Sequence, residues 1–212
     1  MRLGGEGETW SDLEEFSTTH PRSAPVEVRL VDYKEIARDG QADAMKQWTH
    51  RLNESLRRQD PPDVIMYVHG ARVGFVHSCA FAAELDHFSG RDLTPVAFDW
   101  PTHQSIVPYL DRTDLRHARQ SSARLAEMIR VLAEETKVRR IHIVSWSAGA
   151  RVLSGAVEHL ARDGNHAAAR AKYRLGTLVF AAGDIPEKDF IHRLPAVHDL
   201  SDRVLVYLSD DD

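Results

Sequence analysis

The sequence predicts an α/β fold in which helices cover both faces of a mostly parallel sheet, so that the domain is a three-layer sandwich. From residue 63 onward, short apolar runs rich in β-branched residues alternate with longer segments of helical period. Such alternation is typical of βαβ crossovers. The chain has 212 residues, of which 42% are hydrophobic and 28% charged, a balance that can build a core without metals or disulfides. We expect a single domain over residues 26–212, preceded by a loosely ordered, Gly- and Pro-bearing leader over residues 1–25.

The expected strands are short apolar runs bounded by turn residues, and the first of them alternates apolar with charged residues as a half-exposed strand does. In chain order they are Val26–Tyr33, Val64–Val68, Pro95–Asp99, Ile141–Ser145, Thr177–Ala181 and Val204–Leu208. The expected helices have apolar residues spaced three and four apart, and Pro61-Pro62 ends the first of them. They are Ala37–Gln59, Val76–Phe88, Leu110–Thr136 and Ala148–Arg162.

Charge and cysteine content exclude several classes of protein. The 27 Lys and Arg against 32 Asp and Glu give a net charge of −5, so no overall basic field favours a nucleic-acid partner. Cys79 is the single cysteine and cannot form an internal disulfide, and no spaced Cys and His set predicts a zinc site. No apolar run reaches the roughly 18 residues of a membrane span. We therefore expect a cytoplasmic protein without a metal or an organic cofactor.

A serine lies at the turn between an expected strand and an expected helix. The strand at 141–145 leads into Trp146-Ser147-Ala148-Gly149 and then into the helix. A sharp turn here would lift Ser147 above the sheet, beside a helix N-terminus whose N–H groups favour a developing negative charge. Small residues two before and two after the serine let such a nucleophile elbow close, although Ser145 stands where Gly is usual. The alternative is that Ser147 only caps the helix, since Ser is a favoured N-cap residue.

A second turn upstream is placed to supply another oxyanion donor. The strand at 64–68 ends in His69-Gly70-Ala71, and a glycine lets the backbone approach a substrate closely. The N–H of Ala71, or that of Gly70, would pair with the N–H of Ala148 around an oxyanion. His69 itself is more typical of a residue that hydrogen-bonds neighbouring loops than of a base.

Three aromatic residues at or just beyond strand ends are expected to line the pocket, because ligands of open α/β sheets bind outside the carboxyl ends of the strands. They are His69, Trp100 and Trp146. Trp100-Pro101 is also a natural way to end a strand. Trp146 is equally well explained by packing under the elbow.

Together these motifs resemble a family of bacterial α/β hydrolases once catalogued as a domain of unknown function. The matching residues are Val68-His69-Gly70, Trp100-Pro101 and the elbow Ser145-Trp146-Ser147-Ala148-Gly149, and the runs at 178–185 and 204–209 are similar to two later family motifs. The likeness covers about residues 63–212. It departs at Trp146, where the family has His, and at Gly183, where the family usually has Pro.

The resemblance implies the α/β-hydrolase fold and a Ser-acid-His triad with Ser147 as the nucleophile. The acid that best matches the family is Asp212, with Asp210 and Asp211 as close competitors. Asp184, at the tip of the preceding strand, is the runner-up. A run of Asp at a chain end is also typical of a solvated terminus.

No histidine of the sequence matches the family's base, which follows the acid along the chain. His192 and His198 lie between the last two expected strands, and no histidine comes later. A serine hydroxyl without a general base is a weak nucleophile. Either the C-terminal strand and helix of the fold are missing, with the histidine beyond Asp212, or the domain is catalytically silent. The uncovered sheet edge favours the first explanation.

The expected function is that of a serine hydrolase, which cleaves a carboxylic ester or a related small acyl compound through an acyl-enzyme. No metal or cofactor is implied, because nucleophile, oxyanion donors and base perform the reaction. The alternative is a silent, hydrolase-like interaction domain, and a transferase using the same serine chemistry is a weaker third possibility. Substrate identity and oligomeric state stay open.

Overall fold

The computed structural model describes residues 2–3, 9, 11, 28–29, 43–103 and 113–208, and within them a five-stranded parallel sheet forms the centre of the fold. The strand order is β4-β3-β5-β6-β7. The strands are β3 (Val64–Val68), β4 (Thr94–Phe98), β5 (Ile141–Trp146), β6 (Leu175–Ala181) and β7 (Ser201–Tyr207). Two further short strands, β1 (Arg2–Leu3) and β2 (Val28–Arg29), pair antiparallel with each other.

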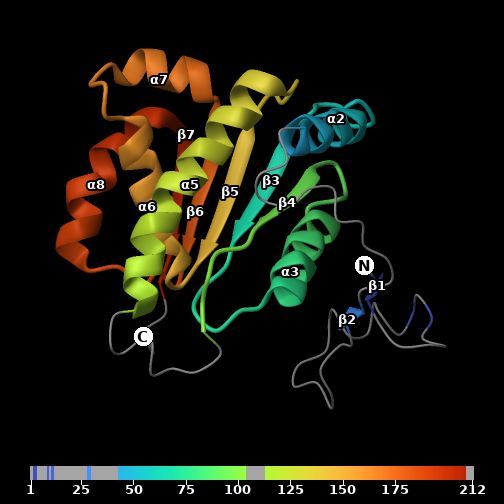
Figure 1. Cartoon of the computed structure of the whole chain (residues 1–212), viewed down its shortest axis with the longest axis horizontal. Coiled ribbons are helices and arrows are strands. Elements are labelled where there is room, and N and C mark those ends of the chain that lie inside the picture. Colours follow the sequence, from blue (N-terminus) through green and yellow to red (C-terminus); the bar gives the residue numbers. More distant parts are fainter. Residues whose placement is uncertain are drawn as a thin grey trace.

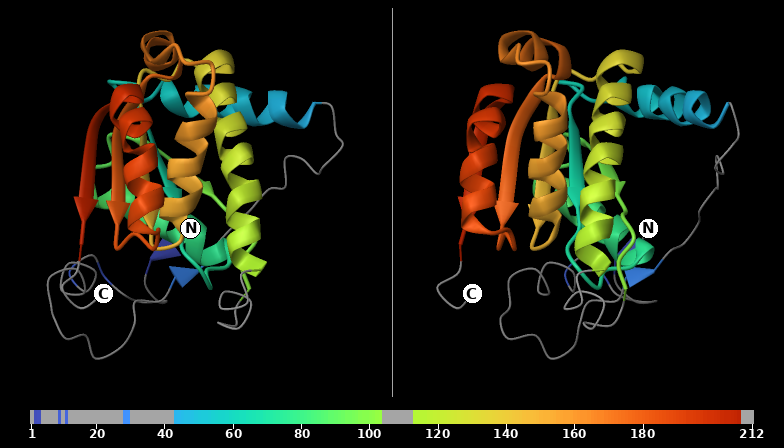
Figure 2. Two further views of the ribbon diagram at one scale, coloured as in Figure 1. Left: turned by 90° about the vertical axis from the view of Figure 1, so that its left-hand side faces the viewer. Right: turned by 60° about the vertical axis from the view of Figure 1, so that its left-hand side comes forward.

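Helices cover both faces of the five-stranded sheet (Figure 1). They are α2 (Ala44–Leu56), α3 (Phe75–Phe88), α5 (Thr113–Glu135), α6 (Gly149–Leu160), α7 (His166–Tyr173) and α8 (Glu187–Leu200). Helices α5, α6 and α8 lie side by side over one face (Figures 1 and 2). Helix α3 packs on β3 and β4 from the other face, where the ring of Phe81 lies 5.5 Å from that of Tyr67. The predicted α/β fold is therefore confirmed.

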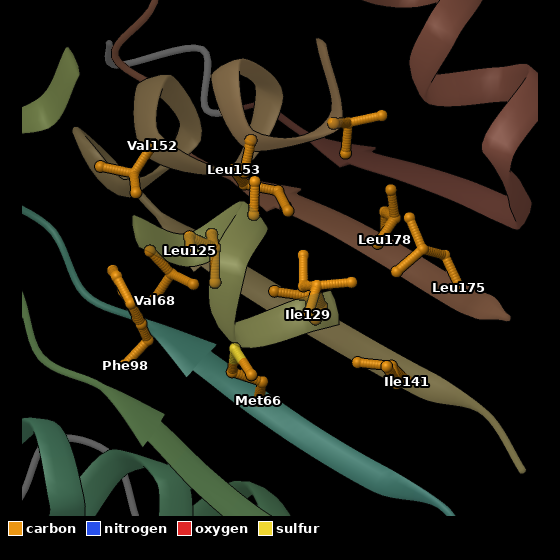
Figure 3. Packing of buried hydrophobic residues seen from close by; sticks show 14 of the residues in the cluster. Met66, Val68, Phe98, Leu125, Ile129, Ile141, Val152, Leu153, Leu175 and Leu178 are labelled. Atoms are coloured by element: carbon orange, nitrogen blue, oxygen red, sulfur yellow. The ribbon is translucent and has the colours of Figure 1, made fainter. Parts of the chain in front are cut away.

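The main core lies between the sheet and helices α5 and α6 (Figure 3). Met66 and Val68 point from β3 toward Leu125 and Ile129 of α5. The intervening Tyr67 points to the opposite face, because successive side chains of a strand alternate. Every residue of β3 is buried, which explains why this strand reads as an uninterrupted apolar run.

Two helices were not predicted. Helix α7 is a short polar segment in which only Tyr173 is buried, and Asn165 caps it by accepting a hydrogen bond from the Ala168 N–H. Helix α8 contains Pro195, which signals a helix break in sequence. Strand β7 also begins at Ser201, three residues before its predicted start.

Several predicted features lie outside the described residues. They are most of the leader, most of the strand at 26–33, the start of the helix at 110–136, and the aspartates Asp210, Asp211 and Asp212. In the part of the chain that is described, no helix is both long and apolar enough to cross a membrane.

Candidate active site

Ser147 occupies a strained turn between β5 and α6. Its φ is 48°, in the left-handed region that a residue with a side chain avoids at a cost of about 1–3 kcal/mol. The turn persists because the backbone of Ser147 is bonded on both sides: its N–H donates to Ala181 O at 3.0 Å, and its carbonyl accepts from the N–H of Ala150 at 3.0 Å. This strand-turn-helix geometry is the one a nucleophile elbow requires.

Two glycines allow the elbow to sit against the end of β3. A Cβ on Gly149 would lie 2.4 Å from Val68 O and 2.7 Å from His69 O, both of them backbone atoms that have little freedom to move. A Cβ on Gly70 would lie 3.0 Å from the Cβ of Ser147. The loop after β3 and the elbow are thus in direct contact, so the two turns singled out in the sequence meet at one place.

Ser145 stands at the position where a glycine is usual in such elbows. The residue is fully buried, and its hydroxyl donates a hydrogen bond to Val179 O of β6 at 2.9 Å. A small polar side chain fits here because its hydroxyl has a partner in the neighbouring strand.

The N–H groups of Ala71 and Ala148 are the candidate oxyanion donors. Among the described residues, neither N–H has a hydrogen-bond acceptor. Ala148 is the residue after Ser147 and directly precedes α6, where N–H groups face an anion favourably. Both groups therefore lack a partner among the described residues at the contact between the loop and the elbow, with Ala71 half-buried and Ala148 fully buried.

His69 and Trp100 form a buried pair behind the loop after β3. The imidazole Nε2 lies 3.0 Å from the backbone nitrogen of Trp100, and Nδ1 lies 2.7 Å from Gly70 O. A neutral imidazole has one donor and one acceptor, so the Trp100 N–H makes Nε2 the acceptor and leaves the proton on Nδ1, which donates to Gly70 O. The indole Nε1 of Trp100 donates to His69 O at 2.8 Å, and the two rings stack.

These contacts place His69 and Trp100 beneath the loop, where both side chains are buried, whereas the sequence suggested a pocket wall. Asp99 adds a carboxylate oxygen 3.2 Å from Nε2 of His69. Thr102 contacts the far end of the loop after β3, where its hydroxyl donates a hydrogen bond to Val73 O at 3.0 Å. Trp146 differs from the buried pair: half of its surface is exposed beside Ser147.

Asp184, the runner-up acid, lies close to the elbow but its carboxylate is already engaged. Oδ1 lies 2.9 Å from Nη2 of Arg151 on α6, and the Asp184 N–H donates to Ser147 O at 3.1 Å. Burial raises the pKa of the Asp184 carboxyl and lowers that of the Arg151 guanidinium, because both groups lose hydration. The 2.9 Å contact acts in the opposite direction, because an ion pair favours the charged form of both groups.

No described residue forms a hydrogen bond to the Ser147 hydroxyl. Both nitrogens of His69 are occupied by backbone groups. His198 lies in the last turn of α8, just before the start of β7, and therefore near the opposite end of the sheet. The described part of the chain also holds no group of three or more His, Cys, Asp or Glu arranged for a metal ion.

Arg151 and Thr102 are the site residues that the sequence reasoning missed. Arg151 comes four residues after Ser147 and lies in the first turn of α6, so its proximity to the elbow could have been inferred from spacing. The contact of Thr102 with Val73 joins two loops 29 residues apart, for which the sequence carries no local signal.

Comparison with known proteins supports the same fold. A family model described as alpha/beta hydrolase of unknown function (DUF900) matches residues 44–212. No curated protein and no solved structure matches the chain. Because the match to this family model covers well over half of the sequence, the chain belongs to this α/β-hydrolase family.

Proposed function

We propose that the protein is a serine hydrolase that cleaves a carboxylic ester or a related small acyl compound through an acyl-enzyme. The observation that carries this proposal is the backbone of Ser147, whose φ of 48° lifts the residue at the carboxyl end of β5. Family membership supports hydrolysis as the class of reaction, while the fold alone does not define a substrate.

The proposed reaction begins with attack of the Ser147 Oγ on the acyl carbonyl carbon as the hydroxyl proton passes to a general base. The N–H groups of Ala148 and Ala71 hold the resulting oxyanion. Collapse of this intermediate breaks the ester bond, and the leaving alcohol takes the proton from the base. Water then releases the acid from the serine by the same steps.

The acid of the proposed triad is Asp212, and Asp184 is the second candidate. The base is a histidine supplied from outside the described residues, because no histidine within them forms a hydrogen bond to the Ser147 hydroxyl. No metal or organic cofactor is required by this scheme.

A silent, hydrolase-like interaction domain is the second candidate function. The observation that favours it is the Ser147 hydroxyl, which has no hydrogen-bond partner in the described part of the chain and is a weak nucleophile without a base. The two candidates differ in one property, the reactivity of Ser147.

Reactivity is tested by treating the protein with a fluorophosphonate and measuring its intact mass. A serine hydrolase is expected to gain one covalent adduct, and Ser147→Ala is expected to abolish it. Ser154→Ala is the matched control: this serine lies on the following helix with its hydroxyl 3.1 Å from Arg193 Nη1, so the adduct should persist. An unmodified wild-type chain would favour the silent domain, and an adduct that survives in Ser147→Ala would show that Ser147 is not the labelled nucleophile.

A further inference from the structure

The loop that follows β6 bonds to both sides of the Ser147 backbone. The Ser147 N–H donates to Ala181 O at 3.0 Å, and Ser147 O accepts from the Asp184 N–H at 3.1 Å. The loop is itself strained, because Ala182 has a φ of 45°. Gly183 lies between these contacts, where an added Cβ would come within 3.2 Å of the Ala150 Cβ. Two backbone hydrogen bonds therefore join the strained turn at Ser147 to a loop that is itself strained at Ala182.

An ion pair also connects the loop after β6 to helix α6. Nη2 of Arg151 lies 2.9 Å from Oδ1 of Asp184, and the two side chains are 22% and 40% exposed. Asp184 thus uses its main chain to bond the carbonyl of Ser147 and its side chain to bond the helix that begins two residues after Ser147. Loss of the ion pair would leave the loop attached to the elbow by its backbone bonds alone.

The ion pair between Arg151 and Asp184 is poorly suited to a role in stabilising the fold and nothing else. The Nε atom of Arg151 is buried without a partner in the described part of the chain, and a buried unpaired donor is unfavourable. Partly buried ion pairs also lose hydration that their mutual attraction only partly offsets. The geometry of the pair therefore points to a positional role.

We propose that Arg151 and Asp184 are positioning residues, which lock the loop after β6 onto the nucleophile elbow and hold Ser147 in its reactive conformation. This inference rests on the proposed serine hydrolase activity. It assigns Asp184 a role that acts through the backbone of Ser147, different from that of a triad acid. A displacement of about 1 Å in a reacting group can lower a rate by about a hundredfold.

The chain offers a matched control pair on the same helix. Glu158 of α6 binds Arg193 of α8 at 3.0 Å, with exposures of 42% and 22%, nearly equal to those of Asp184 and Arg151. Both pairs join α6 to the segment between β6 and β7, but only the first touches the elbow. A merely structural role predicts the same consequences for Asp184→Asn and Glu158→Gln.

Two measurements on the full chain test the proposal. The first is the second-order rate constant for fluorophosphonate labelling of Ser147. The second is hydrogen exchange of the peptide that contains the Asp184 amide. In Asp184→Asn we expect labelling to slow by about 10- to 100-fold and the Asp184 amide to exchange faster. In Glu158→Gln both should stay at wild-type values, and the exchanged pair Arg151→Asp with Asp184→Arg should recover part of the labelling rate.

Each other outcome has a definite meaning. Equal effects of Asp184→Asn and Glu158→Gln on both measurements would overturn the positional role. A loss of labelling on the order of ten-thousandfold with unchanged amide exchange would make Asp184 the triad acid instead. If the wild-type chain is not labelled, the proposed function fails, and the exchange of the Asp184 amide still decides whether the ion pair locks the loop.

Discussion

His69 controls the direction of one peptide group at the candidate site. Its Nδ1–H donates to Gly70 O at 2.7 Å, and the peptide that joins Gly70 to Ala71 is trans. In a trans peptide the carbonyl and the N–H point in opposite directions, so fixing Gly70 O also fixes the Ala71 N–H. His69 would thus direct an oxyanion donor without contacting the substrate.

We predict that His69→Phe slows fluorophosphonate labelling of Ser147 by about 10- to 100-fold, because the Ala71 N–H loses its orientation. Phenylalanine keeps the stacking on Trp100 but leaves Gly70 O and the Trp100 N–H without their partner. Each of these buried groups is expected to cost about 1–3 kcal/mol of unfolding free energy, measured by urea denaturation.

Thr102→Val is the control for His69→Phe. It removes the hydrogen bond to Val73 O on the same loop without touching the peptide between Gly70 and Ala71. It should lower stability and leave the labelling rate of the folded protein unchanged. Wild-type labelling of His69→Phe would contradict the argument.

Sequence reasoning found the positions of the site more readily than the contacts among them. Ser147 could be placed on a turn because the strand before it and the helix after it have strong local patterns. His69 and Trp100 were both noticed, but their pairing joins positions 31 residues apart and depends on the register of β3 beside β4. The pairing of Asp184 with Arg151 was missed because it joins positions 33 residues apart, although the position of Arg151 near the elbow follows from its spacing.

At the scale of secondary-structure elements, the contact between α5 and α6 depends on Gly155. A Cβ on Gly155 would lie 2.6 Å from Oγ and 3.0 Å from Cβ of Ser122. Ser122 is fixed by donation of its hydroxyl to Ala118 O at 2.9 Å and has little freedom to withdraw. The two helices therefore approach each other closely at this pair.

We predict that Gly155→Ala lowers the free energy of unfolding by about 1–2 kcal/mol. Overpacking of a core costs about 1–3 kcal/mol, and the better helix propensity of alanine returns up to about 1 kcal/mol. In a chain that carries Ser122→Gly, the same Gly155→Ala change should be neutral or stabilising. A double-mutant cycle by urea denaturation measures this difference.

Gly164→Ala is the control for the cycle. Its φ of 71° makes alanine unfavourable, but nothing lies within 4 Å of the added Cβ, so its cost should not depend on Ser122. An equal effect of Gly155→Ala in both backgrounds would show that Ser122 is not the group that limits the approach.

Helix α8 shows why some elements could not be predicted from sequence. Pro195 has no N–H to donate to Ile191 O and crowds that carbonyl, so the segment resembles an interrupted helix. The helix forms because Val197 and Leu200 are fully buried and Phe190 packs edge-to-face on Phe180 of β6. These tertiary contacts outweigh a weak local preference.

In the molecule as a whole, a stabilising ion pair and the candidate active site lie at opposite ends of the sheet. The elbow lies at the carboxyl ends of the strands, whereas Asp63 and Arg139 lie just before β3 and β5 at the amino ends. Arg139 donates two hydrogen bonds to the Asp63 carboxylate, at 2.7 and 3.0 Å. The parallel direction of the strands followed from the alternation of strands and helices, but this pair joins residues 76 positions apart and has no local signal in sequence.

The polar start of β7 shows the limit of sequence reasoning at this end of the sheet. Ser201 and Asp202 lack the apolar pattern of a strand, so the strand was expected to begin at Val204. Asp202 instead binds Arg140 at 2.7 Å and Arg170 at 2.8 Å. Partners supplied by other segments allow the strand to start with polar residues.

Burial by itself would raise the pKa of Asp63, but the hydrogen bonds and charge of Arg139 outweigh it and lower the pKa below its usual value. A carboxylate with a lowered folded-state pKa stabilises the fold fully above its unfolded pKa of about 3.9, and this stability is lost as the pH falls through the folded value. We predict that Asp63→Asn lowers the free energy of unfolding by about 1–2 kcal/mol at pH 7. The effect is at the low end for charged hydrogen bonds because Arg139 is 56% exposed.

Urea denaturation as a function of pH tests the assignment. The difference between wild type and Asp63→Asn should be constant above about pH 5 and should shrink below about pH 4, where the wild-type carboxylate becomes protonated. Asp202→Asn is the control: its partners are exposed, so it should cost no more than about 1 kcal/mol. Folded Asp63→Asn should label with fluorophosphonate at the wild-type rate, because the pair lies at the opposite end of the sheet from Ser147. A stability difference that persists unchanged at pH 3 would mean that Asp63 stabilises the fold by packing and neutral hydrogen bonds instead of by its charge.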